Sequence, residues 1–140
     1  MIVLDTNVIS ELMRSQPHPL VFAWTASQPR ASLYTTSINC AEILFGIGAL
    51  PEGRRRKALA NAAAIMFNED LGGRILPFDA AAAARYSEIV VNRHRAGAPS
   101  EAFDALIAAT ASVAGAVVAT RDTGGFEDCG LTLINPWESP

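Results

Sequence analysis

The stretch Ile2-Val3-Leu4-Asp5-Thr6-Asn7 decides the fold of this chain. Its apolar residues are typical of a short strand that is buried in a parallel sheet, and an acid follows them directly. Ligands of open α/β sheets bind at the carboxyl ends of the strands, so we expect Asp5 at the edge where a site would form. Thr6 and Asn7 offer side chains that can cap a short helix over 8–13.

Short apolar strands and helices alternate along the rest of the chain. We expect strands at 33–35, 75–76, 116–120 and 131–134, and helices at 20–27, 38–50, 52–71, 80–96 and 101–114. Ser37, Asp79 and Ser100 are the expected N-caps of three of these helices. The alternation predicts an α/β fold in which helices cover both faces of a parallel sheet. No repeat, linker or shift in composition divides the 140 residues, so we expect a single domain over 1–140.

The composition is that of a compact domain. Hydrophobic residues make up 50% of the chain and charged residues 18%, which excludes a disordered protein. The mean hydropathy of +0.22 is high, but no apolar run approaches the roughly 20 residues that a membrane span needs. We therefore expect no membrane segment, and an apolar interface between subunits instead. The start of the chain lacks the basic region of a signal peptide, which predicts a cytoplasmic protein.

The charge and the cysteine and histidine content exclude some kinds of binding site. The net charge is −3 and the pI about 5.3, unlike a protein that holds duplex DNA by charge alone. Contact with nucleic acid must then come from a local basic patch or from metal ions. The one basic run, 54–57, is more often a solvated helix face than an RNA contact. The two cysteines and two histidines match no disulfide framework or zinc spacing.

Four acidic side chains are expected to meet at one edge of the sheet. Asp5 follows the first strand, and Asp122 stands just beyond the strand expected at 116–120. Glu42 and Asp104 lie early in the helices expected at 38–50 and 101–114. Because helices that follow parallel strands begin at the same edge of the sheet, their first turns face that edge too. The other acids have simpler explanations, as a helix cap or in solvent: Asp79, Glu52, Glu69, Asp70 and Glu138.

Such a cluster needs a positive charge. Ionised carboxylates in an apolar setting either take up protons or require a cation, and no nearby Lys or Arg neutralises all four. Mg²⁺ and Mn²⁺ prefer oxygen ligands, so either ion fits the cluster. The alternative is that Asp5 and Asp104 are only helix caps or first-turn acids that the helix dipole favours.

A metal with open water positions, held by carboxylates, suits the hydrolysis of phosphodiesters. Two other α/β chemistries that combine an early Asp with Mg²⁺ fit less well. A phosphatase of the haloacid-dehalogenase type needs a second acid where this chain has Asn7, and a response-regulator receiver needs a late lysine, whereas the only lysine is Lys57. The chain also lacks the glycine fingerprints of nucleotide-binding loops. A nuclease is the remaining interpretation.

Motifs spread from residue 4 to residue 137 resemble those of PIN domains. They are Leu4-Asp5-Thr6-Asn7-Val8-Ile9-Ser10, Ala41-Glu42-Ile43 with Gly46, Asp104-Ala105-Leu106-Ile107-Ala108-Ala109-Thr110-Ala111, Ala119-Thr120-Arg121-Asp122 and Ile134-Asn135-Pro136-Trp137. Each motif is short, but the set in this order is specific. It resembles the VapC toxins of toxin–antitoxin pairs, particularly their FitB-like branch.

This resemblance implies a Rossmann-like PIN fold, with three α/β/α layers around a mostly parallel sheet, and a homodimer. It implies a type II toxin that hydrolyses RNA with Mg²⁺ or Mn²⁺. It also implies a small VapB-like antitoxin that blocks the site and binds promoter DNA, so that the toxin meets this DNA only through the complex. The alternative is a catalytically silent PIN module that binds RNA or a partner, and the complete set of acids argues against it.

The resemblance also assigns roles to individual side chains. The acidic quartet is Asp5, Glu42, Asp104 and Asp122. Asp5 and Asp104 match the most direct metal ligands, and the other two acids act as ligands or through water. Thr6 and Thr120 match hydroxyls that orient the carboxylates.

One segment departs from the commoner family pattern. Many members have Asn where this chain has Asp122, and an acid where this chain has Gly125 before Phe126. The variant leaves open whether Asp122 touches the metal directly. Arg121 beside it is either the partner of an acid or a contact to phosphate.

Overall fold

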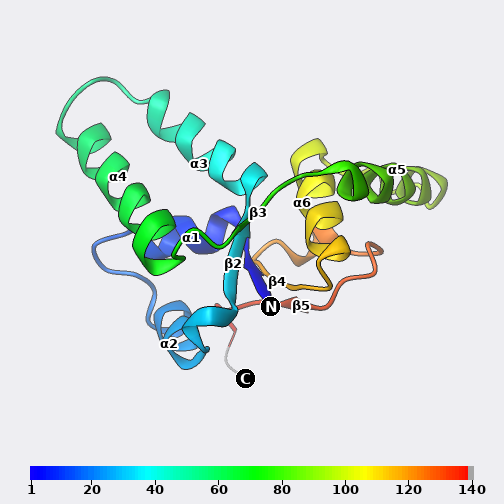
Figure 1. Ribbon diagram of the computed structural model, residues 1–140, viewed down its shortest axis with the longest axis horizontal. Helices are drawn as coiled ribbons and strands as arrows, with labels where there is room; N and C mark the ends of the chain where they lie inside the picture. Colours follow the sequence, from blue (N-terminus) through cyan, green and yellow to red (C-terminus); the bar gives the residue numbers. More distant parts are fainter. Residues whose placement is uncertain (139–140) are drawn as a thin grey trace.

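The computed structural model describes residues 1–138. In this part of the chain, five parallel strands form one sheet in the order β3-β2-β1-β4-β5 (Figure 1). The strands are β1 (Ile2–Leu4), β2 (Leu33–Thr36), β3 (Ile75–Leu76), β4 (Val117–Ala119) and β5 (Leu133–Ile134). Each lies on an apolar run from which a strand is predicted. The all-parallel sheet confirms the predicted α/β class.

β1 is the central strand, and its register with both neighbours aligns their ends. Ile2 lies opposite Leu33 of β2 and Val117 of β4. Val3 and Leu4 are buried and pack on opposite faces of the sheet, because side chains alternate along a strand. Whatever follows β1 therefore emerges in the middle of the sheet edge.

Helices cover both faces of the sheet. Within residues 1–138 the α-helices are α1 (Thr6–Leu12), α2 (Pro19–Ser27), α3 (Ser37–Gly48), α4 (Arg54–Ile65), α5 (Ala80–Arg95) and α6 (Ala102–Val113). α1 to α4 lie on one side of the sheet, and α5 and α6 lie on the other (Figure 1). The first four share a hydrophobic core with Leu4, and α5 and α6 share another with Val3. The predicted three-layer α/β/α arrangement is thereby confirmed. No helix in this part of the chain is long and apolar enough to cross a bilayer.

Two helix starts differ from the sequence-based prediction. Asp5, rather than Thr6 or Asn7, caps α1, because its carboxylate accepts a hydrogen bond from the backbone N–H of Thr6. Thr36, rather than Ser37, caps α3. In both cases the last extended residue carries the capping side chain, as N-cap geometry requires.

On the other face of the sheet, one predicted cap is confirmed and one is wrong. Asp79 caps α5 as predicted, whereas Glu101 and not Ser100 caps α6.

The helix predicted over 52–71 is interrupted. α4 is followed by a π-helical turn, η2 (Met66–Asp70), whose first two residues are both buried. Both side chains belong to the hydrophobic core that contains Leu4.

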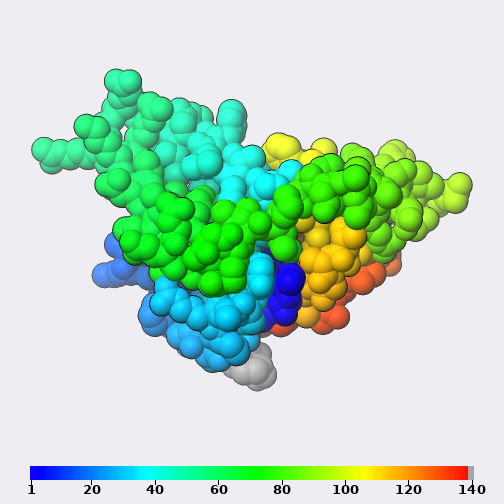
Figure 2. Space-filling view, in the orientation of Figure 1, coloured from blue at the N-terminus to red at the C-terminus, as the bar shows by residue number. Residues whose placement is uncertain are grey.

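α3 and α4 form an arm that projects from the body of the molecule (Figure 2). α3 contains 12 residues and is therefore about 18 Å long. It starts at the sheet and leads away from it, so the basic run at 54–57, which opens α4, lies near the tip of the arm (Figure 1). Two short 3₁₀ turns, η1 (Arg30–Ser32) and η3 (Thr123–Phe126), complete the secondary structure of residues 1–138.

Candidate functional site

The four predicted acids lie at one edge of the sheet. Asp5 directly follows β1, and Asp122 follows β4 and caps η3. Glu42 lies in α3, and Asp104 lies in the first turn of α6. The negative charges of the other three acids all raise the pKa of Asp104. The structure therefore brings the four side chains together, as predicted from the strand ends.

Asp5 is held from several sides. Its Oδ1 accepts hydrogen bonds from the backbone N–H of Thr6 at 2.8 Å and from Nδ2 of Asn39 at 3.1 Å. Its Oδ2 accepts one from Oγ1 of Thr120 at 2.7 Å. Burial is the largest influence on the pKa of Asp5 and raises it, whereas these hydrogen bonds lower it. Groups from α1, α3 and the end of β4 thus fix one carboxylate in place.

Thr120 connects Asp5 to the segment that carries Asp122. Its hydroxyl donates to Asp5 and accepts from the backbone N–H of Asp122 at 3.0 Å. Nδ2 of Asn7 also donates to this hydroxyl, at 3.2 Å, and Oδ1 of Asn7 accepts from the backbone N–H of Arg121 at 3.2 Å. The start of α1 and the loop after β4 are therefore joined through side chains.

Glu42 is held by Thr6. Oγ1 of Thr6 donates to Oε1 of Glu42 at 3.0 Å and accepts from Nδ2 of Asn39, also at 3.0 Å. Burial above all raises the pKa of Glu42; the hydrogen bond from Thr6 lowers it, and the charges of Asp5 and Glu101 raise it further. The hydroxyl of Thr6 therefore supports an acid on another helix, whereas its backbone N–H supports the aspartate beside it in sequence.

Asn39 is a site residue that the sequence-based reasoning missed. It is fully buried, and its Nδ2 is shared between Asp5 and Thr6. Its Oδ1 accepts from Oγ1 of Thr36 at 2.6 Å, and the two residues form a capping box at the start of α3. The spacing of Thr36 and Asn39, three residues apart before an apolar helix, is the signal that could have identified it.

Fewer neighbouring groups stabilise the negative charge of Asp104 than that of Asp5. Burial raises the pKa of Asp104 to about 7, and the charges of Asp5, Glu101, Asp122 and Glu42 contribute to this increase. Without a cation, this carboxyl therefore keeps its proton to a higher pH than an ordinary aspartate does. A cation that binds to it would displace the proton, because metal ligands are held in their ionised form.

Glu101 is a fifth acid, which the sequence-based reasoning also missed. Its side chain accepts a hydrogen bond from the backbone N–H of Asp104 at 3.1 Å, and its charge raises the pKa of both Glu42 and Asp104. Its position three residues before Asp104, at the N-cap of the same helix, is the signal in the sequence.

Asp104 and Asp122 face a common space that Gly125 leaves open. A Cβ atom on Gly125 would lie 2.6 Å from Oδ2 of Asp104 and 3.0 Å from Oδ2 of Asp122. In residues 1–138 none of these acids forms an ion pair with a basic side chain. Carboxylate oxygens that lack a positively charged partner and border a free space suit a hard divalent cation, which prefers oxygen ligands.

The full set of acids does not form a preassembled cage. Among the described residues, no three His, Cys, Asp or Glu side chains are arranged to hold a metal ion.

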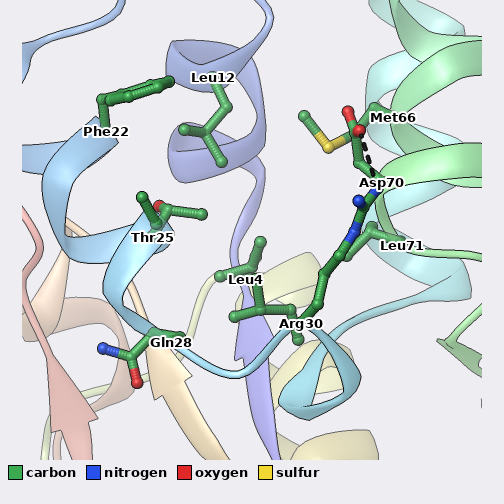
Figure 3. A pocket seen from close by; sticks show the side chains of 11 residues that line it. Leu4, Leu12, Phe22, Thr25, Gln28, Arg30, Met66, Asp70 and Leu71 are labelled. Atoms are coloured by element: carbon green, nitrogen blue, oxygen red, sulfur yellow. Dashed lines mark hydrogen bonds and ion pairs between the residues drawn. The ribbon is translucent and has the colours of Figure 1, made fainter.

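An apolar hollow of about 490 Å³ lies on the face of the sheet that α1 to α4 cover (Figure 3). Leu12, Phe22 and Met66 are among its lining residues, and Arg30 pairs with Asp70 on one side at 3.4 Å. None of the four predicted acids lines this hollow in the described part of the chain, so it is separate from the acid site.

Comparisons with known proteins point to one family. A model described as the PIN domain matches residues 2–130. The VapC ribonuclease Y4jK of Sinorhizobium fredii is 45% identical over 138 residues, which cover 99% of each chain. The toxin FitB of Neisseria gonorrhoeae is 40% identical over 137 residues, which cover 98% of this chain and 99% of FitB. A solved structure of FitAB bound to an IR36 DNA fragment matches with a TM-score of 0.92 and 39% identity, covering 100% of this chain and 98% of that chain.

Proposed function

Because this chain belongs to the PIN domain family, we propose that it is the toxin of a type II toxin–antitoxin pair and hydrolyses the phosphodiester bonds of RNA. The observation that carries this proposal is the convergence of four carboxylates at the sheet edge without a basic partner in residues 1–138. The names of the relatives, a ribonuclease and a toxin, support the same activity.

The proposed ligands of a divalent cation, Mg²⁺ or Mn²⁺, are the acids of the quartet. Asp5 and Asp104 are the direct ligands in this proposal, and Glu42 and Asp122 act as ligands or through water. A bound cation supplies a water of lowered pKa and offsets the negative charge that develops on the phosphate. These roles of the four acids are the ones that the sequence pattern assigns to them, and they are part of the proposal.

The chain's own residues prepare the site for this reaction. Thr120 and Asn39 fix the two oxygens of Asp5, and Thr6 fixes Glu42. Because these carboxylates are already oriented, they can position the attacking water in line with the scissile bond without further ordering. Asp104 releases its proton when the site is loaded.

We also propose the partners of this toxin. A small antitoxin would cover the acid site, and promoter DNA would be contacted through the complex, as the structure of FitAB bound to DNA supports. The net charge of −3 agrees with little direct hold on duplex DNA. We further propose that the toxin acts in the cytoplasm. We also propose that it forms a homodimer, because α3 exposes Leu44 and Phe45, which a second copy would cover.

A cleavage assay tests the proposed activity. The purified chain, free of antitoxin, is incubated with total RNA in Mg²⁺, Mn²⁺ or EDTA, beside the variants Asp104→Asn and Asp79→Asn. We expect discrete fragments that require the metal, and a loss of about a hundredfold or more in Asp104→Asn. Asp79→Asn is the matched control, because Asn caps a helix as well as Asp does.

Two outcomes would contradict the proposal. Cleavage that persists unchanged in Asp104→Asn would remove this acid from the reaction. Absence of cleavage by folded protein, with either ion and several RNA pools, would favour the silent binding module instead.

A further inference from the structure

Arg121 is exposed to solvent, and its backbone adjoins the acid site. It lies between Thr120 and Asp122, and its backbone N–H is held by Asn7 at 3.2 Å. Its guanidinium carbon lies 5.0 Å from the ring centroid of Trp137, which is a cation–π contact. In residues 1–138 the Arg121 side chain forms no ion pair with an acid. Of the two roles that the sequence left open, the contact to phosphate therefore fits better.

Trp137 fixes the position of this guanidinium. The indole is half-buried and packs against the core that α1 to α4 share, which holds the ring in place. The ring is therefore a fixed surface for the side chain of Arg121. A guanidinium that stacks on an aromatic face keeps the N–H groups along its edge available. That edge matches the geometry of two phosphate oxygens.

RNA needs such a contact near the acids. The carboxylates around Asp104 repel a polyanion, and the whole chain is negatively charged. The basic run at 54–57 lies near the tip of the arm, about the length of α3 away from the sheet (Figure 2). Within one chain, the basic run therefore lies too far from the acids to hold the phosphates beside the scissile bond.

We propose that Arg121, held on the indole of Trp137, binds a phosphate of the RNA strand next to the one that is cut. This inference rests on the proposed ribonuclease function and adds a substrate-binding residue to it. Arg121 is the binding residue, and Trp137 is a positioning residue that acts through Arg121.

The test measures RNA binding without cleavage. The Asp104→Asn chain in Mg²⁺ is titrated into a fluorescein-labelled single-stranded RNA of mixed sequence at several salt concentrations. Adding Arg121→Ala should weaken binding about tenfold. It should also flatten the slope of log K against log salt by about 0.7, the contribution of one phosphate contact on a single strand. Arg121→Lys should keep the slope and lose part of the affinity, because an ammonium lacks the planar edge.

A matched control separates a local contact from a general loss of charge. Arg55→Ala removes the same charge from an exposed position on the arm and should leave both affinity and slope unchanged. In a chain with Asp104 intact, Arg121→Ala should raise KM about tenfold and leave kcat nearly unchanged. Trp137→Leu should raise KM in the same direction while Trp137→Phe, which keeps an aromatic face, restores it.

Two results of this test would contradict the proposed contact between Arg121 and phosphate. An unchanged salt slope in Arg121→Ala, or an equal change in Arg55→Ala, would overturn it. If the wild-type chain cuts no RNA, the proposed function fails, but the salt slope still shows whether Arg121 contacts phosphate.

Discussion

At the scale of single residues, Asp104 connects the site to pH. In the unfolded chain its carboxyl ionises near the ordinary value of 3.8, whereas burial and neighbouring carboxylates raise the pKa of Asp104 to about 7 in the folded chain. The neutral form favours folding, and this contribution is fully present below pH 3.8. It is lost as the pH rises through about 7, because the folded chain must then hold the charge.

The variant Asp104→Asn cannot ionise and should therefore stabilise the metal-free protein at high pH. We expect its Tm to exceed that of the wild type by about 3 °C at pH 8, a modest value because the side chain is partly exposed to solvent. The difference should shrink as the pH falls toward 5. Circular dichroism melts in EDTA between pH 5 and 8 measure it, with Asp79→Asn as control.

Addition of Mg²⁺ should raise the Tm of the wild type above that of Asp104→Asn. The ion stabilises only a folded chain that binds it, so the wild type gains and Asp104→Asn does not. A Tm difference that stays the same at every pH would show that the carboxyl does not titrate as described.

At the scale of elements, the first turn of α3 serves both the fold and the site. Asn39 closes the capping box with Thr36 and also donates to Asp5. A single buried side chain thus starts α3 and orients an acid at the start of α1. Its loss should therefore affect stability and chemistry together.

We expect Asn39→Ala to lower the free energy of unfolding by about 1–3 kcal/mol, because buried donors and acceptors lose their partners. For a domain of this size the Tm should fall by about 4–10 °C. RNA cleavage below the new Tm should fall at least about tenfold, since Asp5 loses one of its hydrogen bonds. Asn61→Ala, at an exposed position on α4, is the matched control. Wild-type stability with wild-type cleavage in Asn39→Ala would contradict both roles.

The limits of prediction from sequence follow from what each signal measures. The positions of β1 and the other strands could be predicted because apolar runs between helices report burial directly. The convergence of the four acids could be predicted because parallel strands share one carboxyl edge. Both arguments depend on chain order and hydrophobicity alone.

The partners of individual side chains could not be predicted in this way. Thr6 supports Glu42, and Thr120 supports Asp5, although each hydroxyl lies beside a different acid in the sequence. Contacts between α1, α3 and the end of β4 depend on how these elements pack, which sequence spacing does not reveal. The same reason explains why Asn39, which carries no charge, was missed.

At the scale of the whole molecule, the arm formed by α3 and α4 exposes apolar side chains. Phe45 is 77% exposed and Leu44 is 56% exposed. Large apolar side chains that are grouped on a surface favour association, and the mean hydropathy of +0.22 agrees with an interface. The arm is therefore the surface on which we propose that two copies meet.

The variant Phe45→Ser should shift the protein from dimer to monomer. Because the side chain is exposed within one chain, the fold itself should be unaffected and the far-ultraviolet circular dichroism unchanged. Light scattering after gel filtration gives the mass. Phe22→Ser removes an exposed aromatic from α2 and should leave the dimer intact. A wild-type monomer, or an unchanged dimer in Phe45→Ser, would place the interface elsewhere or remove it.

The hydrogen bond between Thr120 and Asp5 joins residues 115 positions apart. A ribosome adds about 5–20 residues per second, so on the order of ten seconds pass between the synthesis of the two. During that time Asp5 lacks the partner that orients its second oxygen, and Asp104 and Asp122 are also still to come. On the proposed function, a nascent chain should therefore be unable to cut RNA until Thr120 and Asp122 have been synthesised, because the acid site is incomplete before then.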